Sequence, residues 1–428
     1  MKKHAVLLLS VLVIVSMILA ACQAAPATQA PAAEEPAAEQ PAAEEPAAEE
    51  PAAEEPQQPA AENALNSEAA AVAMQFFSQE ELDGDKELMS AEPMGPEGQP
   101  WVQYLIDNPV ETTEYAKEGP YTVCFSNAGV NNPWRVVGYT NMTEEVKLHP
   151  EIEEFIHVDA EGSDEKQISD IEDLLASGNC DVLIVSPNTT AALTPAVEEA
   201  CEQLPVIVFD RGVQTDCPVS FIRPIGGYAF GTSGAQFIVD NLPEGGNVLA
   251  LRILPGVDVL EHRWAAAKQI FEQNPQITVV GVEFGDGNNT KVKGIVNDYL
   301  DRFGTIDAVW MDAGATAVAA LEAFQDAGQP FPVMVGEDQQ DFLKFWADND
   351  LTAIAPTFPT YQWRTPIIAA LQILNGEPVQ KRWVLPQQPV TQENLDQYYN
   401  PAMPPLHYAQ CGCEEMPNYP EAWGGTAE

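Results

Sequence analysis

The chain has 428 residues, enough for two domains of ordinary size, and its 65 acidic against 19 basic residues give a formal net charge of -46. A nucleic-acid partner requires a basic face for its phosphates, so this balance excludes nucleic acid and argues against an anionic membrane surface. Acidity of this degree supports solubility and says little about fold.

The first 22 residues have the pattern of an export signal. Lys2 and Lys3 precede an apolar core at 6–17, which is too short for a comfortable bilayer span and ends in small residues. The following Leu19-Ala-Ala-Cys22 resembles the lipobox of bacterial lipoproteins, which implies cleavage before Cys22 and attachment of lipid to it. We therefore expect an extracytoplasmic protein anchored by lipid to the outer face of the cell membrane.

Residues 23–63 are of low complexity. A Pro-Ala-Ala-Glu-Glu unit repeats every five residues from Pro31 to Pro51, once with Gln40 in place of glutamate. Regular prolines block a continuous helix and the glutamates repel one another, which predicts an extended, disordered tether. Residues 64–118 are expected to form an N-terminal extension packed on the main domain, with a short helix at 69–77.

Six cysteines follow the lipobox, and outside the cytoplasm an even number favours disulfides. Their pairing stays open. Cys411-Gly-Cys413 with His407 alone is too sparse for a zinc site, so we expect structural cysteines, no metal and no cofactor.

From Tyr121 onward, short apolar runs alternate with helical patterns. Strands are expected at 121–125, 154–158, 181–185 and 206–209, with helices at 133–148, after Asp164 and at 193–202. Asn132 and Pro133 suit the cap and first residue of the first helix, and Asp164 is expected to cap the second. Such βαβ units predict a parallel sheet covered on both faces.

A second set of alternating elements follows. Strands are expected at 247–251, 278–282, 308–311, 333–335 and 353–355, with helices near 229–241, 260–274, 291–303, 316–327, 341–348 and 366–374. Nine strands of parallel type exceed what one compact sheet needs, so we predict an α/β protein with two doubly wound lobes.

Four motifs stand at the ends of these elements, where open α/β sheets bind ligands. They are Asn131-Asn-Pro-Trp134, Asp210-Arg211, Ile222-Arg-Pro-Ile-Gly-Gly-Tyr228 and Gly336-Glu-Asp338. In this order they resemble the type I periplasmic binding proteins, in particular the ribose-binding-like receptors of ABC importers, over about residues 119 to 400. The resemblance implies two parallel-sheet lobes joined by a three-segment hinge.

In the first lobe, Asp210 and Arg211 match the acid–base pair of that family, although a surface ion pair at a strand end is the plain alternative. A sugar hydroxyl both donates and accepts, so a carboxylate beside a guanidinium suits it. Trp134 matches an aromatic position that stacks on a sugar, and Asn132 caps the helix beside it. Arg135 replaces a second aromatic, which leaves room for a more polar or acidic ligand.

In the second lobe, the resemblance implies Arg263 and Asp338 as ligand contacts. Asp312 stands near an Asn-Asp pair of the relatives, with the register open by one residue, and Thr357 replaces a glutamine. Ser186 follows the third strand at a position that contacts ligand in relatives. The predicted ligand-binding set is Asn132, Trp134, Arg135, Asp210, Arg211, Arg263, Asp312, Asp338 and Thr357.

Hinge crossings are expected near 223–226, 356–358 and 385–388. They would divide the chain into lobe 1 (119–224 with 358–385), lobe 2 (225–357 with 386–410) and a C-terminal tail at 411–428.

These features predict a monomeric binding protein, not an enzyme, that captures a small polar ligand, in first place a sugar, and delivers it to the membrane permease of an ABC importer. One alternative is a sensor subunit that presents ligand to a membrane chemoreceptor or kinase. Another is a secreted glycoside-cleaving enzyme, but pairing each acid with an arginine favours ionised acceptors over a proton donor. The phosphate-binding and nucleophile motifs Gly-x-x-x-x-Gly-Lys-Ser/Thr and Gly-x-Ser-x-Gly are absent from the sequence.

Overall fold

The structure is a computed structural model that describes residues 63–426. The predicted signal segment, the predicted lipid-attachment residue Cys22 and the proline-rich repeat lie outside the described residues. Within 63–426, two large parallel sheets form the framework, and β1 (Pro109–Val110) pairs with β12 (Val379–Gln380) in a small antiparallel sheet. A search of this part of the chain for helices long and apolar enough to cross a membrane finds none.

The lobe 1 sheet has six strands in the order β13-β6-β5-β4-β2-β3, all parallel. The strand order reverses between β2 and β4, which is where a doubly wound sheet opens a crevice for ligands. The strands are β2 (Tyr121–Asn127), β3 (Ile152–Asp159), β4 (Val182–Ser186), β5 (Val206–Phe209), β6 (Ser220–Pro224) and β13 (Arg382–Leu385).

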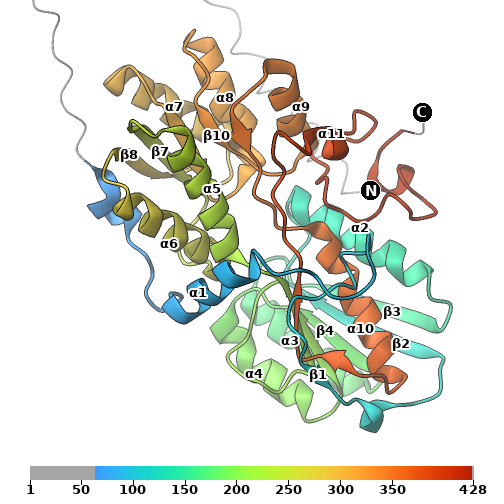
Figure 1. The fold of residues 1–428 in the computed structure, drawn as a ribbon. Helices are drawn as coiled ribbons and strands as arrows, with labels where there is room; N and C mark the ends of the chain where they lie inside the picture. Colours follow the sequence, from blue (N-terminus) through green and yellow to red (C-terminus); the bar gives the residue numbers. More distant parts are fainter. Residues whose placement is uncertain (1–62, 427–428) are drawn as a thin grey trace, which may run out of the picture. The chain divides into compact units, whose positions relative to one another are not determined.

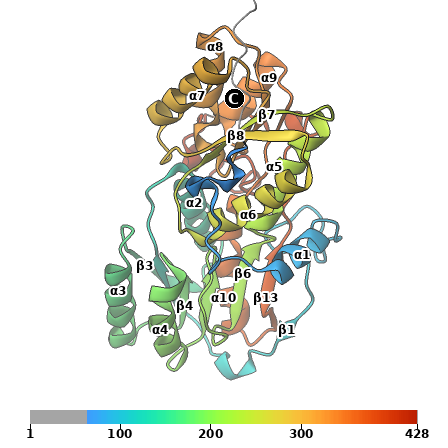
Figure 2. The ribbon, with the colours of Figure 1, turned by 90° about the vertical axis from the view of Figure 1, so that its left-hand side faces the viewer.

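Helices cover both faces of this sheet because its central strands are apolar on both sides. On one face, Cys124, Leu183 and Val208 pack against α3 (Asp164–Ser177) and α4 (Thr190–Cys201). On the other face, alternate strand residues such as Val123 and Ile184 pack against α2 (Pro133–Lys147) and α10 (Thr365–Leu374). Figure 2 shows α3 and α4 on one side of the sheet and α10 on the other. This alternation is the two-residue period of a strand.

The lobe 2 sheet repeats the same winding with five parallel strands in the order β11-β10-β9-β7-β8. One face packs against α5 and α6, and the other against α7, α8 and α9. Figure 1 shows these helices around the sheet. The elements are β7 (Gly246–Arg252), β8 (Ile277–Phe284), β9 (Ala308–Met311), β10 (Val333–Val335), β11 (Ala353–Ile354), α5 (Gly227–Asn241), α6 (Asp258–Gln273), α7 (Asn289–Phe303), α8 (Ala317–Asp326) and α9 (Gln340–Asn349). The predicted fold class of two doubly wound α/β lobes is confirmed.

Several local expectations need correction. The cap of α3 is Ser163, whose hydroxyl accepts from the Lys166 amide, and not Asp164. The sequence prediction also missed β6 and β13, which extend the lobe 1 sheet. Each contains an arginine, and β6 ends in Pro224, so neither reads as a buried parallel strand of the kind found at the sheet centre. Asn132 does cap α2, accepting from the Arg135 amide.

The N-terminal extension contacts both lobes. The helix predicted at 69–77 is wrong: two short 3-10 turns, η1 (Ala64–Asn66) and η2 (Glu68–Ala70), precede α1 (Gln79–Leu88), which begins after the capping Ser78. Leu65 and Ala70 are buried in the core of lobe 2, α1 packs on α5, and β1 then pairs beside lobe 1.

The chain passes between the two sheets at three internal places. These lie between β6 and α5, between β11 and η5 (Thr360–Trp363), and between β13 and α11 (Leu395–Tyr398). The C-terminal segment adds another connection: the Ala409 amide donates to the Asp338 carbonyl in lobe 2, and the Trp423 indole donates to Asn141 of α2 in lobe 1.

The six cysteines after Cys22 form three disulfides, Cys124–Cys180, Cys201–Cys217 and Cys411–Cys413. This agrees with the prediction that these cysteines are structural. His407 lies within 4.8 Å of the last pair. Because both sulfurs are bonded to each other, this group does not offer two thiolates to a metal.

Candidate functional site

Asp210, at the carboxyl end of β5, is the acid at the centre of the lobe 1 site. Its φ of 68° is left-handed, a conformation that costs a residue with a side chain energy and occurs often at functional sites. The carboxylate is 5% exposed and accepts from the Arg135 guanidinium at 2.8 Å and from the Ser186 hydroxyl at 3.3 Å. The fold therefore holds this acid in a fixed, charge-assisted network.

Arg135, which was predicted to leave room for an acidic ligand, is itself buried and paired. Besides Asp210, it donates to the side chains of Asn127 at 3.1 Å and Ser186 at 3.4 Å. Burial lowers the pKa of Arg135 to about 10, with Asp210 opposing the shift, so the guanidinium is charged at neutral pH. Its charge is thus compensated inside lobe 1 by Asp210.

Trp134 and Asn132 lie at the start of α2, where Asn132 is the predicted cap. The Trp134 indole donates to the Phe358 carbonyl at 2.7 Å, and its ring centroid lies 5.7 Å from that of Phe358 and 5.6 Å from that of Trp363. Trp134 thus packs against the segment that connects the lobes. Asn132 caps α2 and lines a separate hollow beside His407.

Arg211 is half-buried next to Asp210. Its guanidinium donates to the backbone carbonyl of Asn188, and the residue lines two cavities, one of about 490 Å³ and one of about 290 Å³. Arg211 therefore borders open space. Unlike Asp210, it has no oppositely charged side chain as a partner among the described residues.

In lobe 2, Arg263 of α6 forms a buried ion pair with Glu337 at 3.2 Å. The guanidinium carbon lies 3.9 Å from the Phe230 ring centroid and 5.2 Å from that of Phe358. Glu337 also accepts from the Gly314 amide at 3.1 Å and the Tyr408 hydroxyl at 3.2 Å. Sequence reasoning selected Asp338 from the Gly-Glu-Asp motif and missed Glu337, because either acid can follow a strand.

Asp312 and Asp338 are fully buried beside this pair. Burial raises the pKa of each carboxyl to about 7, above the ordinary 3.8. Asp312 accepts from the Ile253 amide at 2.8 Å and Asp338 from the Gln410 amide at 2.7 Å, while the other oxygen of each lacks a partner among the described residues. The C-terminal segment therefore covers Asp338, which sequence reasoning placed at the ligand.

Thr357 and Phe358 lie on the connecting segment after β11. The Thr357 hydroxyl donates to the Gln388 carbonyl at 2.9 Å, and the Gln387 amide donates to the Thr357 carbonyl at 2.8 Å. Thr357 thus joins two of the connecting segments. Phe358 stands between Trp134 of lobe 1 and Arg263 of lobe 2.

A cavity of about 200 Å³ lies where the lobes meet, and Asp210 lines it from lobe 1. The opposite wall comes from Tyr228 and His262, whose rings stack at 4.4 Å. Thr190 of α4 donates to Asp258 of α6 at 3.1 Å, so the lobes touch beside this space. Of the predicted set, Asp210 and Arg211 line cavities at the carboxyl end of β5, whereas Arg263, Asp312 and Asp338 are buried within lobe 2.

Two further wall residues, Glu81 and Asp85, come from α1 of the N-terminal extension. Asp85 pairs with Arg223 at 3.2 Å, and burial raises the pKa of Asp85 to about 6 although Arg223 opposes the shift. Sequence reasoning missed them because an acid on a polar helix carries no signal of what that helix packs against.

Comparison with known proteins identifies the family to which this architecture belongs. The family model described as periplasmic binding protein domain matches residues 123–378. The ribose import binding protein of Bacillus subtilis (strain 168) is 30% identical over 274 residues, covering 64% of this chain and 88% of the relative. The D-xylose-binding periplasmic protein of Escherichia coli (strain K12) is 27% identical over 187 residues, covering 42% and 56% respectively.

Solved structures show the same fold. A solute binding protein of an ABC transporter from Bacillus halodurans C-125 with bound myo-inositol superposes with a TM-score of 0.58 at 22% identity, covering 66% of this chain and 98% of that one. The fructose binding periplasmic domain of a hybrid two component system gives 0.57 at 24% identity, covering 65% and 92%. Sheet order, domain match and relatives agree, and the chain belongs to the type I periplasmic binding proteins.

Proposed function

We propose that this protein is an extracytoplasmic receptor that captures a sugar between its two lobes and hands it to the permease of an ABC importer. The observation that carries the proposal is the position of Asp210. This acid is held in a left-handed conformation at the carboxyl end of β5 and borders the cavity between the lobes. A relative of which the chain covers 88% is named a ribose import binding protein, which supports a sugar as ligand.

The recognition chemistry follows from the cavity walls. The Asp210 carboxylate accepts from Arg135 and keeps acceptor capacity for hydroxyl groups, while Arg211 can donate. Tyr228 and Phe358 add apolar surface, as is common in small-molecule sites. Of the sites predicted from sequence, we retain Asp210 and Arg211 as ligand contacts. Arg135, Trp134 and Thr357 position them, and Arg263, Asp312 and Asp338 support the floor.

We further propose that lipid on Cys22 anchors a monomeric receptor to the membrane. The Leu19-Ala-Ala-Cys22 pattern supports this anchor. Metabolic labelling with a radioactive fatty acid should label the wild-type protein and leave Cys22→Ser unlabelled; a labelled variant would contradict the anchor.

Ligand binding is tested by a thermal-shift screen of the purified protein against ribose, xylose, arabinose, fructose, glucose, myo-inositol and glycerol, followed by calorimetry on any hit. A ligand at 100 times its Kd should stabilise the fold by about 2.7 kcal/mol. Asp210→Asn keeps the shape of the side chain and should abolish the calorimetric signal, because one of the two carboxylate oxygens that can accept hydrogen bonds is replaced by an amide group. Unchanged affinity in this variant would show that the site lies elsewhere.

A sensor subunit is the second candidate, since the same fold serves as the periplasmic domain of a hybrid two component system. Uptake of radiolabelled ligand separates the two roles. Deleting the gene should abolish high-affinity uptake if the protein serves an importer. Unchanged uptake together with a lost transcriptional response to the ligand would favour the sensor.

A further inference from the structure

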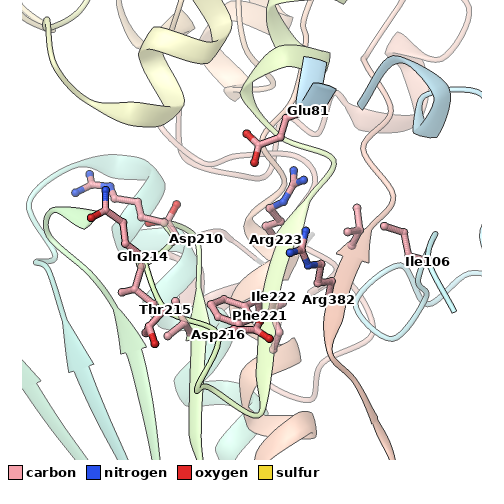
Figure 3. Close-up of a pocket in the computed structure, with 15 residues that line it drawn as sticks. Glu81, Ile106, Asp210, Gln214, Thr215, Asp216, Phe221, Ile222, Arg223 and Arg382 are labelled. Carbon is pink, nitrogen blue, oxygen red and sulfur yellow. The ribbon is translucent and has the colours of Figure 1, made fainter. Parts of the chain in front are cut away.

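The largest cavity near the site lies on the lobe 1 sheet at its β6–β13 edge, and its volume is about 490 Å³. We call it the arginine pocket, bounded by Glu81, Asp210, Asp216, Phe221, Arg223 and Arg382. Figure 3 shows Glu81, Arg223 and Arg382 along one side, with Asp210 and the 214–216 loop on the other. Glu81, Asp210, Gly212 and Arg223 also line the cavity between the lobes, so the two spaces share a wall.

The pocket forms because one sheet face is left without a helix at this edge. Phe221 and Arg223 alternate with Ile222, which packs toward α10, so they point to the opposite face. On that face, α3 and α4 cover the strands up to β5. Of β6, only Phe221 packs against this cluster, and it is partly buried. At the β6–β13 edge the cover comes from the extension, where the Leu105 amide donates to the Val384 carbonyl at 2.8 Å.

Four of the fifteen residues that line the pocket lie outside the part of the chain that matches the family domain, residues 123–378. Glu81 and Ile106 belong to the extension, and Arg382 and Val384 to β13. The extension and β13 therefore complete a wall whose other residues lie within the matched domain.

Two arginines from neighbouring strands meet in the pocket. In the β6–β13 register, Phe221 is paired with Arg382 and Arg223 with Val384, so the two arginines are diagonal neighbours on one face, within reach of each other's long side chains. Arg223 is held by Asp85 at 3.2 Å. Arg382 is exposed, and among the described residues its side chain makes neither an ion pair nor a hydrogen bond. Arg382 is thus an unpaired cation beside a second cation, Arg223, although the chain has 65 acidic residues that could pair with it. Two neighbouring positive charges favour the binding of an anionic group.

We propose that the arginine pocket is a subsite for the carboxylate of an acidic sugar, such as a uronate, whose ring is held in the cavity at Asp210. A planar carboxylate matches the fork of a guanidinium. Glu81 and Asp216 disfavour a second negative charge, so a carboxylate fits better than a phosphate, and Phe221 and Ile222 supply the apolar floor. This inference rests on the proposed sugar-binding function and specifies its ligand class.

The test uses matched ligand pairs, galactose with galacturonate and glucose with glucuronate, together with glucose 6-phosphate. Calorimetry on the wild-type protein should give a uronate affinity at least tenfold above that for the neutral partner. Arg382→Gln should remove this preference and leave the affinity for the neutral sugar unchanged, and Arg382→Lys should restore only part of it. Arg302→Gln, an exposed arginine on α7 that does not line the pocket, is the matched control and should change neither affinity.

The outcomes separate the inference from the function on which it rests. Neutral sugars that bind in an Asp210-dependent way, with no uronate preference, would overturn the subsite and leave the receptor standing. A preference that survives Arg382→Gln would place the carboxylate elsewhere and also overturn it. Tighter binding of glucose 6-phosphate than of either uronate would contradict a carboxylate subsite and indicate a phosphate subsite. Failure of every sugar and uronate to bind would remove both proposals.

Discussion

Each lobe buries an arginine against a carboxylate near the carboxyl edge of its sheet, yet the two centres are completed differently. In lobe 1, Arg135 and Asp210 share hydrogen bonds with Ser186, and Asp210 borders open space. In lobe 2, Arg263 and Glu337 are closed in by aromatic rings and by the Tyr408 hydroxyl.

The difference shows that residue types alone do not make a binding site. Arg263 Nε and Asp312 Oδ2 lack hydrogen-bond partners among the described residues, so the lobe 2 centre carries a desolvation cost that no visible contact relieves. The lobe 1 centre satisfies its buried groups and directs its carboxylate to a cavity. We therefore interpret lobe 1 as the side that selects the ligand and the lobe 2 centre as a support for the connecting segment.

Breaking the lobe 2 pair should have the largest effect on stability. Glu337→Ala leaves Arg263 buried without its carboxylate, and the free energy of unfolding should fall by about 3–5 kcal/mol. Urea denaturation followed by fluorescence measures the change. The double variant Arg263→Met/Glu337→Leu should lose less than the single one, because it removes both charges of the pair and leaves neither uncompensated; equal losses would contradict this explanation.

The second-largest expected effect is on the pH dependence of stability, through Asp338 of lobe 2. The folded pKa of Asp338, about 7, lies above the ordinary 3.8, so its contribution to stability is fully present below about pH 4 and is lost as the pH rises through 7. Asp338→Asn stays neutral and can still accept from the Gln410 amide. Its stability advantage over the wild type should grow by about 3 kcal/mol between pH 5 and pH 8.

Unfolding free energies at the two pH values check this prediction. Asp312 titrates in both proteins, so the difference isolates Asp338. An advantage of the same size at pH 5 and pH 8 would mean that Asp338 is ionised throughout.

Removing a single hydrogen-bonding group from lobe 1 should cost less. Ser186→Ala deletes the hydroxyl that lies between Arg135 and Asp210, and the loss should be about 1–2 kcal/mol in denaturant unfolding. Ser233→Ala is the control, since that hydroxyl donates only to the Ala229 carbonyl within its own helix and should matter little. Similar losses in both variants would argue against a special role for Ser186.

The smallest effect on stability is expected from breaking an exposed ion pair. Arg302 and Asp298 lie 3.2 Å apart on α7 with side chains 54% and 62% exposed. Arg302→Gln should change the free energy of unfolding by less than about 0.5 kcal/mol, because water screens the charges. A change above about 1 kcal/mol would show that geometry weighs more than burial in this protein.

The sequence by itself determined the α/β class, the two lobes and the position of Asp210 at a strand end, because alternating apolar runs and helical periods are local properties. Local chemistry also determined the Asn132 cap. The strands β6 and β13 and the helix α1 were not predicted, because the role of their residues depends on the surfaces that they pair with or cover.

Only the tertiary structure decided which charges compensate each other. Arg135 and Arg263 look alike in the sequence as cations in predicted helices, and both are buried partners of acids in the structure. Arg382 carried no sequence signal, yet it faces the largest cavity near the site beside Arg223. The physical reason is that the free energy of a charge depends on solvent exposure and on neighbours distant in the chain, and neither is written in local sequence.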